Sequence, residues 1–254
     1  MLINWNAIEE IEKLYNNWIV VDSIICDIPY WTTNCPWDSV IPFDVMWKLL
    51  NKIIKKNWPI VLFGSEPFTS KLVCSNINNF KEKIIWLKNK SWSWMQAKQK
   101  HLKIFEDIII FSNSCEYTFN PQKWLVEEKE FLTQRKTFKE FFQNSELYSN
   151  AIRTQKKDDW TRNPLSIVSC KVPFNTSNSK QYSNDIEIRV HPTQKPLLLM
   201  EYLVKSFSNE WEVVLDFTMW SWTTWVACKN LNRKFIWIEL DENYFNVAKN
   251  RINS

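Results

Sequence analysis

The chain contains sixteen tryptophans and a single glycine in 254 residues, and this inversion limits what it can fold into. Average glycine usage of roughly 7% predicts about 18 glycines in a chain of this length. Only Gly64 is present. Tight turns and close backbone approaches need glycine because a side chain obstructs positive φ. The chain as printed therefore lacks the residue on which most of its turns depend.

Many of the tryptophans occupy positions where glycine is expected. Asn57-Trp58-Pro59 and Asn209-Glu210-Trp211 each precede an apolar run, and Trp220-Ser221-Trp222 separates a predicted strand from a predicted helix. Our hypothesis is that the gene uses the codon UGA for glycine and was translated with a code that reads UGA as tryptophan. The residues that then stand for glycine are Trp5, Trp18, Trp31, Trp58, Trp92, Trp94, Trp124, Trp160, Trp211, Trp220, Trp222, Trp225 and Trp237. Trp37, Trp47 and Trp86 are interpreted as true tryptophans.

Length and charge bound the function classes. The length suits one large α/β domain, and the net charge of +4 is mild. From Lys81 to Lys103, however, the sequence has seven lysines and one acidic residue, Glu82. Such a basic stretch indicates either a contact with a polyanion or a solvated charged face. Six cysteines without a C-x-x-C pair argue against a zinc site or a disulfide framework. The chain has no leader-like N-terminus and no long apolar run, so we expect a cytoplasmic protein that does not enter a membrane.

Short apolar runs alternate with helical patterns, which predicts a mostly parallel sheet flanked by helices. Strands are expected at about Ile19–Cys26, Ile60–Phe63, Lys83–Leu87, Asp107–Phe111, Glu212–Phe217 and Lys234–Glu239. Helices are expected at Ala7–Tyr15, Phe43–Lys55, Pro67–Ile77, Pro196–Phe207, Thr223–Leu231 and Glu242–Arg251. Between about residues 112 and 188 the pattern fails, which indicates a segment inserted into a single domain of residues 1–254.

Two motifs follow predicted strands. Asp27-Ile28-Pro29-Tyr30 ends an apolar run, and the carboxyl ends of parallel strands face the ligand crevice. A planar nucleobase with an exocyclic amine suits this set, because Asp27 and a backbone carbonyl near Pro29 accept hydrogens while Tyr30 stacks. The second motif runs from Asp216 to Thr224, and with glycine restored it is a glycine turn at a helix N-terminus. Glu239 ends the next strand, where an acid commonly binds ribose hydroxyls.

Together with His191-Pro192-Thr193-Gln194-Lys195-Pro196, these motifs make the chain resemble the amino-methylating DNA methyltransferases that use S-adenosylmethionine, in the permuted β-type order. The resemblance implies a doubly wound, mostly parallel, seven-stranded Rossmann-like sheet, with residues 112–188 as the target-recognition region. The catalytic residues that it implies are Asp27, Pro29 and Tyr30, although Ile28 replaces the first proline of the motif.

The resemblance also implies the binding residues. Those for the cofactor are Asn6, His191, Thr193, Lys195, Asp216, Phe217, Trp220, Ser221, Trp222, Thr223 and Glu239, with Asn6 in place of the usual acid. Those for double-stranded DNA are Lys88, Lys90, Lys98, Lys100 and Lys103. Indoles at 220 and 222 would occupy the space of the cofactor, since one tryptophan buries roughly 150–250 Å².

The implied reaction is direct in-line methyl transfer from S-adenosylmethionine to adenine N6, after the base has flipped out of the duplex. Asp-x-Pro-Tyr favours adenine over cytosine N4, which stays an alternative. If the tryptophans are real, the alternative is an inactive nucleic-acid-binding relative with aromatic platforms. An RNA or small-metabolite substrate is a third interpretation. A cognate restriction endonuclease is a candidate partner, and both a monomer and a homodimer are compatible with the sequence.

Overall fold

The computed structural model describes residues 2–4, 7–30, 40–91, 95, 97–125, 161–172, 194–219 and 222–239. The chain divides into two compact units, residues 1–120 with 166–254, and residues 121–165. In the smaller unit, β6 (Trp124–Leu125) pairs antiparallel with β7 (Thr161–Arg162). In the larger unit a single sheet carries the predicted motifs.

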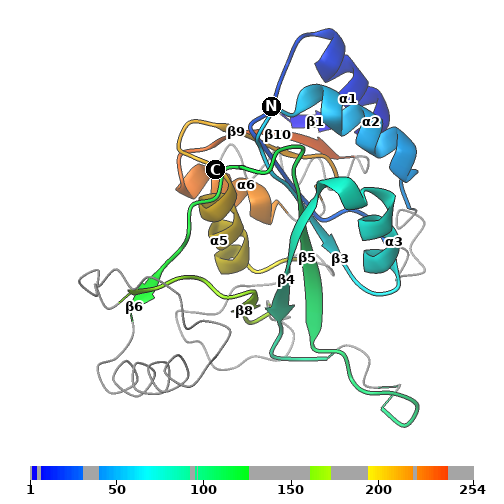
Figure 1. The fold of residues 1–254 in the computed structure, drawn as a ribbon, viewed down its shortest axis with the longest axis vertical. Coiled ribbons are helices and arrows are strands. Elements are labelled where there is room, and N and C mark those ends of the chain that lie inside the picture. Colours follow the sequence, from blue (N-terminus) through cyan, green and yellow to red (C-terminus); the bar gives the residue numbers. More distant parts are fainter. Residues whose placement is uncertain are drawn as a thin grey trace, which may run out of the picture. The chain divides into compact units, whose positions relative to one another are not determined.

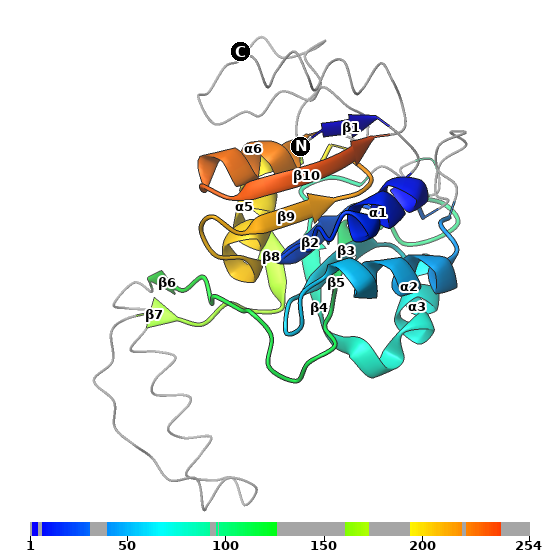
Figure 2. The same cartoon turned by 90° about the horizontal axis from the view of Figure 1, so that it is seen from above.

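In the described part of the chain, eight strands form this sheet, in the order β1-β10-β9-β2-β3-β5-β4-β8 (Figures 1 and 2). Their bounds are β1 Leu2–Asn4, β2 Ser23–Cys26, β3 Ile60–Gly64, β4 Phe80–Leu87, β5 Phe105–Phe111, β8 Ile167–Ser169, β9 Val213–Asp216 and β10 Lys234–Glu239. All neighbouring pairs are parallel except those of β5, which runs antiparallel to both β3 and β4. The predicted class, a mostly parallel doubly wound sheet, is confirmed. Strands β1 and β8, each of three residues, extend its edges beyond the runs visible in the sequence.

Helices cover both faces of the sheet. On one side lie α1 (Ala7–Asn16), α2 (Phe43–Ile53) and α3 (Phe68–Ser75), followed by the short turn η1 (Ile77–Asn79). On the other side lie α5 (Leu197–Phe207) and α6 (Thr223–Asn230), as Figure 2 shows. Five of the predicted helices are thus confirmed to within a few residues, and the predicted helix Glu242–Arg251 lies outside the described residues. No helix among the described residues has the length and apolar character needed to cross a bilayer.

The alternating directions of side chains along the central strands explain why the sheet has a hydrophobic core on each face. Ile24 and Cys26 of β2 enter the core beneath α1 and α2, whereas Ile25 enters the core beneath α5 and α6. Strands β2 and β3 are buried along their whole length, as expected for strands covered on both faces. Successive residues of a strand point to opposite faces, so a continuous apolar run feeds both cores.

The chain leaves the neighbouring strands β2 and β9 toward opposite edges of the sheet. From β2 the chain passes through α2 to β3 on one side, and from β9 it passes through α6 to β10 on the other. Crossovers are right-handed, so a change of direction puts α2 and α6 on opposite faces and opens a crevice at the carboxyl ends of β2 and β9. Ligands of open α/β sheets bind in such a crevice.

Candidate active site

Two carboxylates lie at the crevice, one from each predicted motif. Asp27 directly follows β2, and Asp216 is the last residue of the neighbouring β9. Thr218 joins the two motifs, since its hydroxyl donates to the Asp27 carbonyl at 2.9 Å and its backbone N–H donates to Asp216 Oδ1 at 3.3 Å. The Cys26 thiol lies 2.9 Å from the same hydroxyl oxygen. The two sequence motifs therefore form one site.

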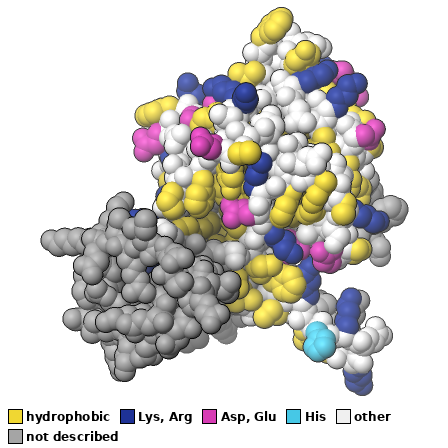
Figure 3. All heavy atoms as spheres, in the orientation of Figure 1, with side chains coloured by type: hydrophobic (Ala, Val, Ile, Leu, Met, Phe, Trp, Pro, Cys, Tyr) yellow, Lys and Arg dark blue, Asp and Glu magenta, His cyan; other side chains and the backbone are white. Residues whose placement is uncertain are grey.

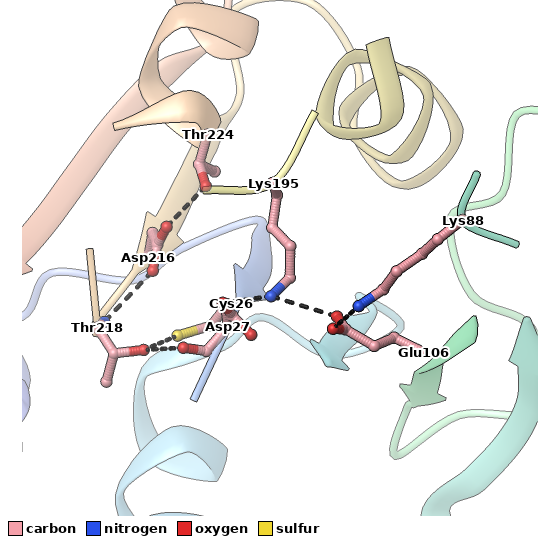
Figure 4. A network of polar contacts seen from close by, with 8 residues as sticks. All are labelled: Cys26, Asp27, Lys88, Glu106, Lys195, Asp216, Thr218 and Thr224. Atoms are coloured by element: carbon pink, nitrogen blue, oxygen red, sulfur yellow. Dashed lines mark hydrogen bonds and ion pairs between the residues drawn. The ribbon is translucent and has the colours of Figure 1, made fainter. Parts of the chain in front are cut away.

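A chain of alternating charges continues from Asp27, as Figure 4 shows. Lys195 Nζ lies 2.6 Å from Asp27 Oδ2 and 3.4 Å from Glu106 Oε2, and Lys88 pairs with the other oxygen of Glu106. All four side chains are largely buried, with exposed fractions between 7% and 15%. Buried charges persist where they are paired, so each member depends on its neighbours.

The surroundings tune the pKa values of this network. Burial raises the pKa of Asp27 to about 6, although Lys195 opposes the shift, and the negative charge of Glu106 adds to it. Burial alone would lower the pKa of Lys195, but the attraction of Asp27 and Glu106 raises it well above the ordinary lysine value. Lys195 therefore keeps its positive charge, and Asp27 titrates about one unit below neutral pH, at a pKa of about 6.

Pro29 and Tyr30 follow Asp27 in the same turn. Pro29 is buried, whereas Tyr30 is partly exposed and its ring centroid lies 5.6 Å from that of Phe68 in α3. A partly exposed ring beside a buried carboxylate is a suitable surface for stacking a planar ligand.

On the β9 side, Asp216 is held in place by α6. Thr224 Oγ1 donates to Asp216 Oδ2 at 2.7 Å, and burial raises the pKa of this carboxyl. Phe217, Thr223 and Glu239 are all buried at the ends of β9 and β10 or the start of α6. The structure thus brings these predicted cofactor residues to the carboxyl ends of adjacent strands.

Three indoles from α6 and β10 form a separate buried cluster. Trp222, Trp225 and Trp237 are 3%, 6% and 1% exposed and pack around Met219. The rings of Trp225 and Trp237 meet edge to face at 5.7 Å, and Phe235 stacks on Trp237 at 4.1 Å. A nucleoside cannot share this volume with three buried indoles, because protein interiors are already close-packed.

The predicted DNA-binding lysines lie in three different surroundings. Lys90, Lys98 and Lys100 are exposed on the connection between β4 and β5, which projects from the sheet in Figure 1 and carries the dark blue side chains at the lower right of Figure 3. Lys103 donates to Ser65 Oγ at 2.5 Å, near the end of β3. Lys88 lies inside the network with Glu106, where burial lowers its pKa.

Sequence reasoning missed Glu106, and it included Thr218 and Thr224 in the second motif without giving either a role of its own. Glu106 had one signal, an acid at the start of an apolar run, which is unusual for a buried strand. The predicted cofactor residues Asn6, His191, Thr193, Trp220 and Ser221 lie outside the described residues.

Comparison with known proteins identifies the family. Residues 21–250 match the DNA methylase family of N6- and N4-acting enzymes. The chain belongs to this family. It is 44% identical over 270 residues to the type II methyltransferase M.HpaI of Haemophilus parainfluenzae, covering 100% of this chain and 74% of that protein. It is 26% identical over 268 residues to the DNA adenine methyltransferase YhdJ of Escherichia coli strain K12, covering 99% and 82%.

Solved structures share the fold. The M1.HpyAVI–SAM complex superposes with a TM-score of 0.62 at 23% identity, covering 99% of this chain and 98% of that one. The cytosine-N4-specific PvuII DNA methyltransferase superposes with a TM-score of 0.63 at 14% identity, covering 98% and 85%. The Rossmann-like fold that the sequence predicts is therefore that of solved DNA methyltransferases.

The residues present only partly fit S-adenosylmethionine. Asp216, Thr223 and Glu239 supply the acids and the helix N-terminus that such a cofactor needs. The indole of Trp222 does not fit it, because this side chain is buried at the N-cap of α6, where a ligand at the helix N-terminus would approach the backbone.

Proposed function

We propose that this DNA methyltransferase transfers a methyl group from S-adenosylmethionine to the exocyclic N6 of adenine in double-stranded DNA. The observation that carries the proposal is the junction of the two motifs. Asp27, at the end of β2, lies beside Asp216, at the end of β9, and Thr218 contacts both. A base-binding residue next to the cofactor strand is what methyl transfer to a bound base requires.

Asp27 has the properties of an acceptor for amino hydrogens. The lone pair of an adenine amine is delocalised into the ring, so a group that attracts the amino hydrogens localises the lone pair on nitrogen. A carboxylate with a pKa of about 6 is ionised at neutral pH and can accept these hydrogens. Thr218 fixes the backbone of the same residue, which orients the Asp27 side chain.

Tyr30 would hold the flipped base by stacking. The target atom lies inside the base stack of a duplex, so an enzyme has to extrude the nucleotide before it can act. The Tyr30 ring is partly exposed and leans on Phe68, which limits its motion. Stacking on such a ring is indifferent to sequence, so sequence choice must come from elsewhere.

We assign sequence choice to residues 112–188 and phosphate contacts to the exposed lysines between β4 and β5. Lys90, Lys98 and Lys100 lie on a connection that projects from the sheet, where they can reach a duplex backbone. One relative is named as a type II methyltransferase, and we therefore regard a cognate restriction endonuclease as a candidate partner of this chain.

Two observations favour adenine over cytosine. Asp27-Ile28-Pro29-Tyr30 resembles the motif of adenine-acting enzymes, and a relative covering 99% of the chain is named as an adenine methyltransferase. The fold does not distinguish adenine-specific from cytosine-specific enzymes, since the cytosine-specific PvuII enzyme shares it. Cytosine N4 therefore stays the second candidate.

Nucleoside analysis tests the proposal. The protein from its native source is incubated with duplex DNA, RNA or protein and with S-adenosylmethionine labelled in the methyl group, and the labelled DNA is digested to nucleosides. We expect label in N6-methyl-2′-deoxyadenosine. Label in N4-methyl-2′-deoxycytidine would move the function to the second candidate, and label confined to RNA or protein would refute the proposal.

A further inference from the structure

Most of the positive φ angles in the described residues belong to tryptophans. Among the described residues, five non-glycine residues have positive φ, namely Trp18 (58°), Asn57 (69°), Trp211 (68°), Trp222 (55°) and Asn232 (58°). Asparagine tolerates this region because its short side chain bonds locally, but a bulky aromatic residue there is an outlier. Three of the five therefore occupy a conformation that suits glycine.

The hydrogen bonds around Trp18 identify a glycine position independently. After α1, the N–H of Ile19 donates to Leu14 O at 2.9 Å and the N–H of Trp18 donates to Tyr15 O at 3.0 Å. This pair of bonds defines a Schellman motif, whose left-handed residue is usually glycine. The Trp18 side chain is 90% exposed, so packing does not explain its presence.

Trp211 occupies a comparable position. The N–H of Glu212 reaches Asn209 O at 3.4 Å, which closes a four-residue turn with Trp211 in third place. A positive φ at the third position of a turn is the geometry that selects glycine. Trp211 is 66% exposed, so this indole too gains little from packing.

The indole N–H groups separate the buried tryptophans into two kinds. Trp47 Nε1 donates to Ser75 Oγ at 2.8 Å, and Trp86 Nε1 donates to Cys170 O at 3.0 Å. Trp237 Nε1 is buried without a hydrogen-bond partner among the described residues. Native buried tryptophans normally find a partner for this group. Trp47 and Trp86, interpreted from the sequence as true tryptophans, satisfy the rule, whereas Trp237 breaks it.

We infer that the working protein carries glycine at the thirteen positions assigned above, and that S-adenosylmethionine binds at the turn before α6 that Trp222 obstructs in the chain as printed. The first part stands on backbone geometry, while the second rests on the proposed function. Glycine at the N-cap of α6 permits the φ of 55° observed there. Glycine in β10 opens the sheet surface beside Asp216, to which it is paired in register.

Intact-mass measurement tests the first part without any reference to function. Protein from the native source should be lighter than the printed sequence by thirteen differences between tryptophan and glycine. Tandem mass spectra of the peptides should show glycine at positions 18, 211, 222, 225 and 237 and tryptophan at 47 and 86. Tryptophan at the first five positions overturns the inference.

Ligand binding tests the second part. The quadruple variant Trp220→Gly, Trp222→Gly, Trp225→Gly and Trp237→Gly of the printed chain should bind S-adenosylmethionine in calorimetry, and the printed chain should not. The control Trp18→Gly relieves a strained turn far from the site and should leave cofactor binding absent. Equal binding by the printed chain and the quadruple variant overturns this part and leaves the mass result intact.

The charged network carries a second, independent inference, which again concerns the proposed function. Lys195 lies between two carboxylates, 2.6 Å from Asp27 and 3.4 Å from Glu106. If Asp27 accepts hydrogen bonds from the target amine, its ion pair with Lys195 has to weaken or break. A buried ammonium that loses its partner is costly, so a second acceptor must be within reach.

We propose that Glu106 is a positioning residue that holds Lys195 when Asp27 engages the target amine, with Lys88 fixing Glu106 from the other side. The glutamate is well placed for this role, because one of its oxygens pairs with Lys88 while the other faces Lys195. Its negative charge also acts on Asp27, which lies at the far end of the same chain of charges (Figure 4).

Carboxyl titration by nuclear magnetic resonance tests this role. With ¹³C-labelled aspartate, Glu106→Gln should lower the apparent pKa of Asp27, because a negative charge near it is removed while Lys195 turns wholly to Asp27. The matched control Glu82→Gln removes an acid from neighbouring β4, where it bonds Tyr117, and should leave the Asp27 titration unchanged. An Asp27 titration unaltered by Glu106→Gln overturns the proposal.

Turnover by the native, methylating form of the protein gives a second readout. Glu106→Gln should lower kcat by about 100-fold through misplacement of Asp27, with DNA affinity unchanged. Glu106→Asp, which keeps the charge, should recover part of the loss. A variant that loses DNA affinity and kcat in parallel would indicate a structural role only and would overturn the assignment.

Discussion

The hydroxyl of Thr218 donates a hydrogen bond to the main-chain carbonyl of Asp27 at 2.9 Å, across the boundary between β9 and β2. Thr218 follows the strand that ends in Asp216, so this bond ties the cofactor-side loop to the base-side turn. The Cys26 thiol lies within hydrogen-bond distance of the same hydroxyl.

In the native, glycine-bearing protein, the form in which methylation is measured in this and the next two predictions, removal of that hydroxyl should slow catalysis and weaken folding by similar free energies. Thr218→Val keeps the shape of the side chain but deletes the bond, which is worth about 1 kcal/mol in stability. We expect methylation to fall by about tenfold, as for a barrier raised by a similar free energy. The measurements are single-turnover methylation and thermal unfolding. Thr218→Ser is the control, since it retains the hydroxyl and should methylate like the unaltered protein.

Asp27→Ala should abolish most methyl transfer while DNA binding persists. The loss of a residue that polarises the reacting amine costs about 100- to 10,000-fold in rate. Asp44→Ala, which alters an exposed acid at the start of α2, serves as the control and should have no effect on rate. Retained methylation by Asp27→Ala, measured with labelled cofactor, would rule out the assigned role.

Methylation should decline as the pH falls through about 6, the value to which burial raises the pKa of Asp27. Below that pH the carboxyl is protonated, and it then offers a proton instead of accepting hydrogens from the amine. Rates at saturating DNA from pH 5 to 8 check this, with DNA affinity measured across the same range. A rate that is flat from pH 5 upward would show that Asp27 is not the titrating group.

Replacement of Lys90, Lys98 and Lys100 by glutamine should weaken DNA binding and reduce its salt dependence. Each lysine that no longer neutralises a phosphate lowers the slope of log K against log salt by about 0.9, so the triple variant should change the slope by about 3. The control variant changes Lys48 and Lys71, which are exposed on α2 and α3. An unchanged slope would mean that the lysines between β4 and β5 form only a solvated face.

Substitution of glycine for tryptophan should stabilise the fold at exposed positions with a positive φ and destabilise it at a buried position where the indole donates a hydrogen bond. Trp18→Gly and Trp211→Gly should each stabilise the printed chain by about 1–2 kcal/mol, because they remove the cost of a side chain in the left-handed region. Trp86→Gly should destabilise it by about 3–5 kcal/mol, because a buried, hydrogen-bonded indole is removed. Denaturant unfolding measures both. Destabilisation by all three variants would argue that the exposed tryptophans are native.

Local patterns in the sequence were sufficient for the helices, the central strands and the two motifs. The apolar run Ile60–Phe63 lies within β3 (Ile60–Gly64), and the run Lys234–Glu239 coincides with β10. The strand predicted at Ile19–Cys26 begins only at Ser23, since Trp18 and Ile19 close the Schellman turn after α1. Runs of three residues such as β8 were not recognisable, because so short a strand has no period of its own.

The sequence by itself determined which chemical groups end the central strands, because apolar periodicity and the order of Asp27, Lys195 and Asp216 are local features of the chain. Only the tertiary structure decided which of these groups meet. Lys195 and Asp27 are 168 residues apart, and Glu106 joins them from an antiparallel strand that no local pattern places there. Side-chain pairing of this kind depends on strand order and burial, which arise from the packing of the whole sheet.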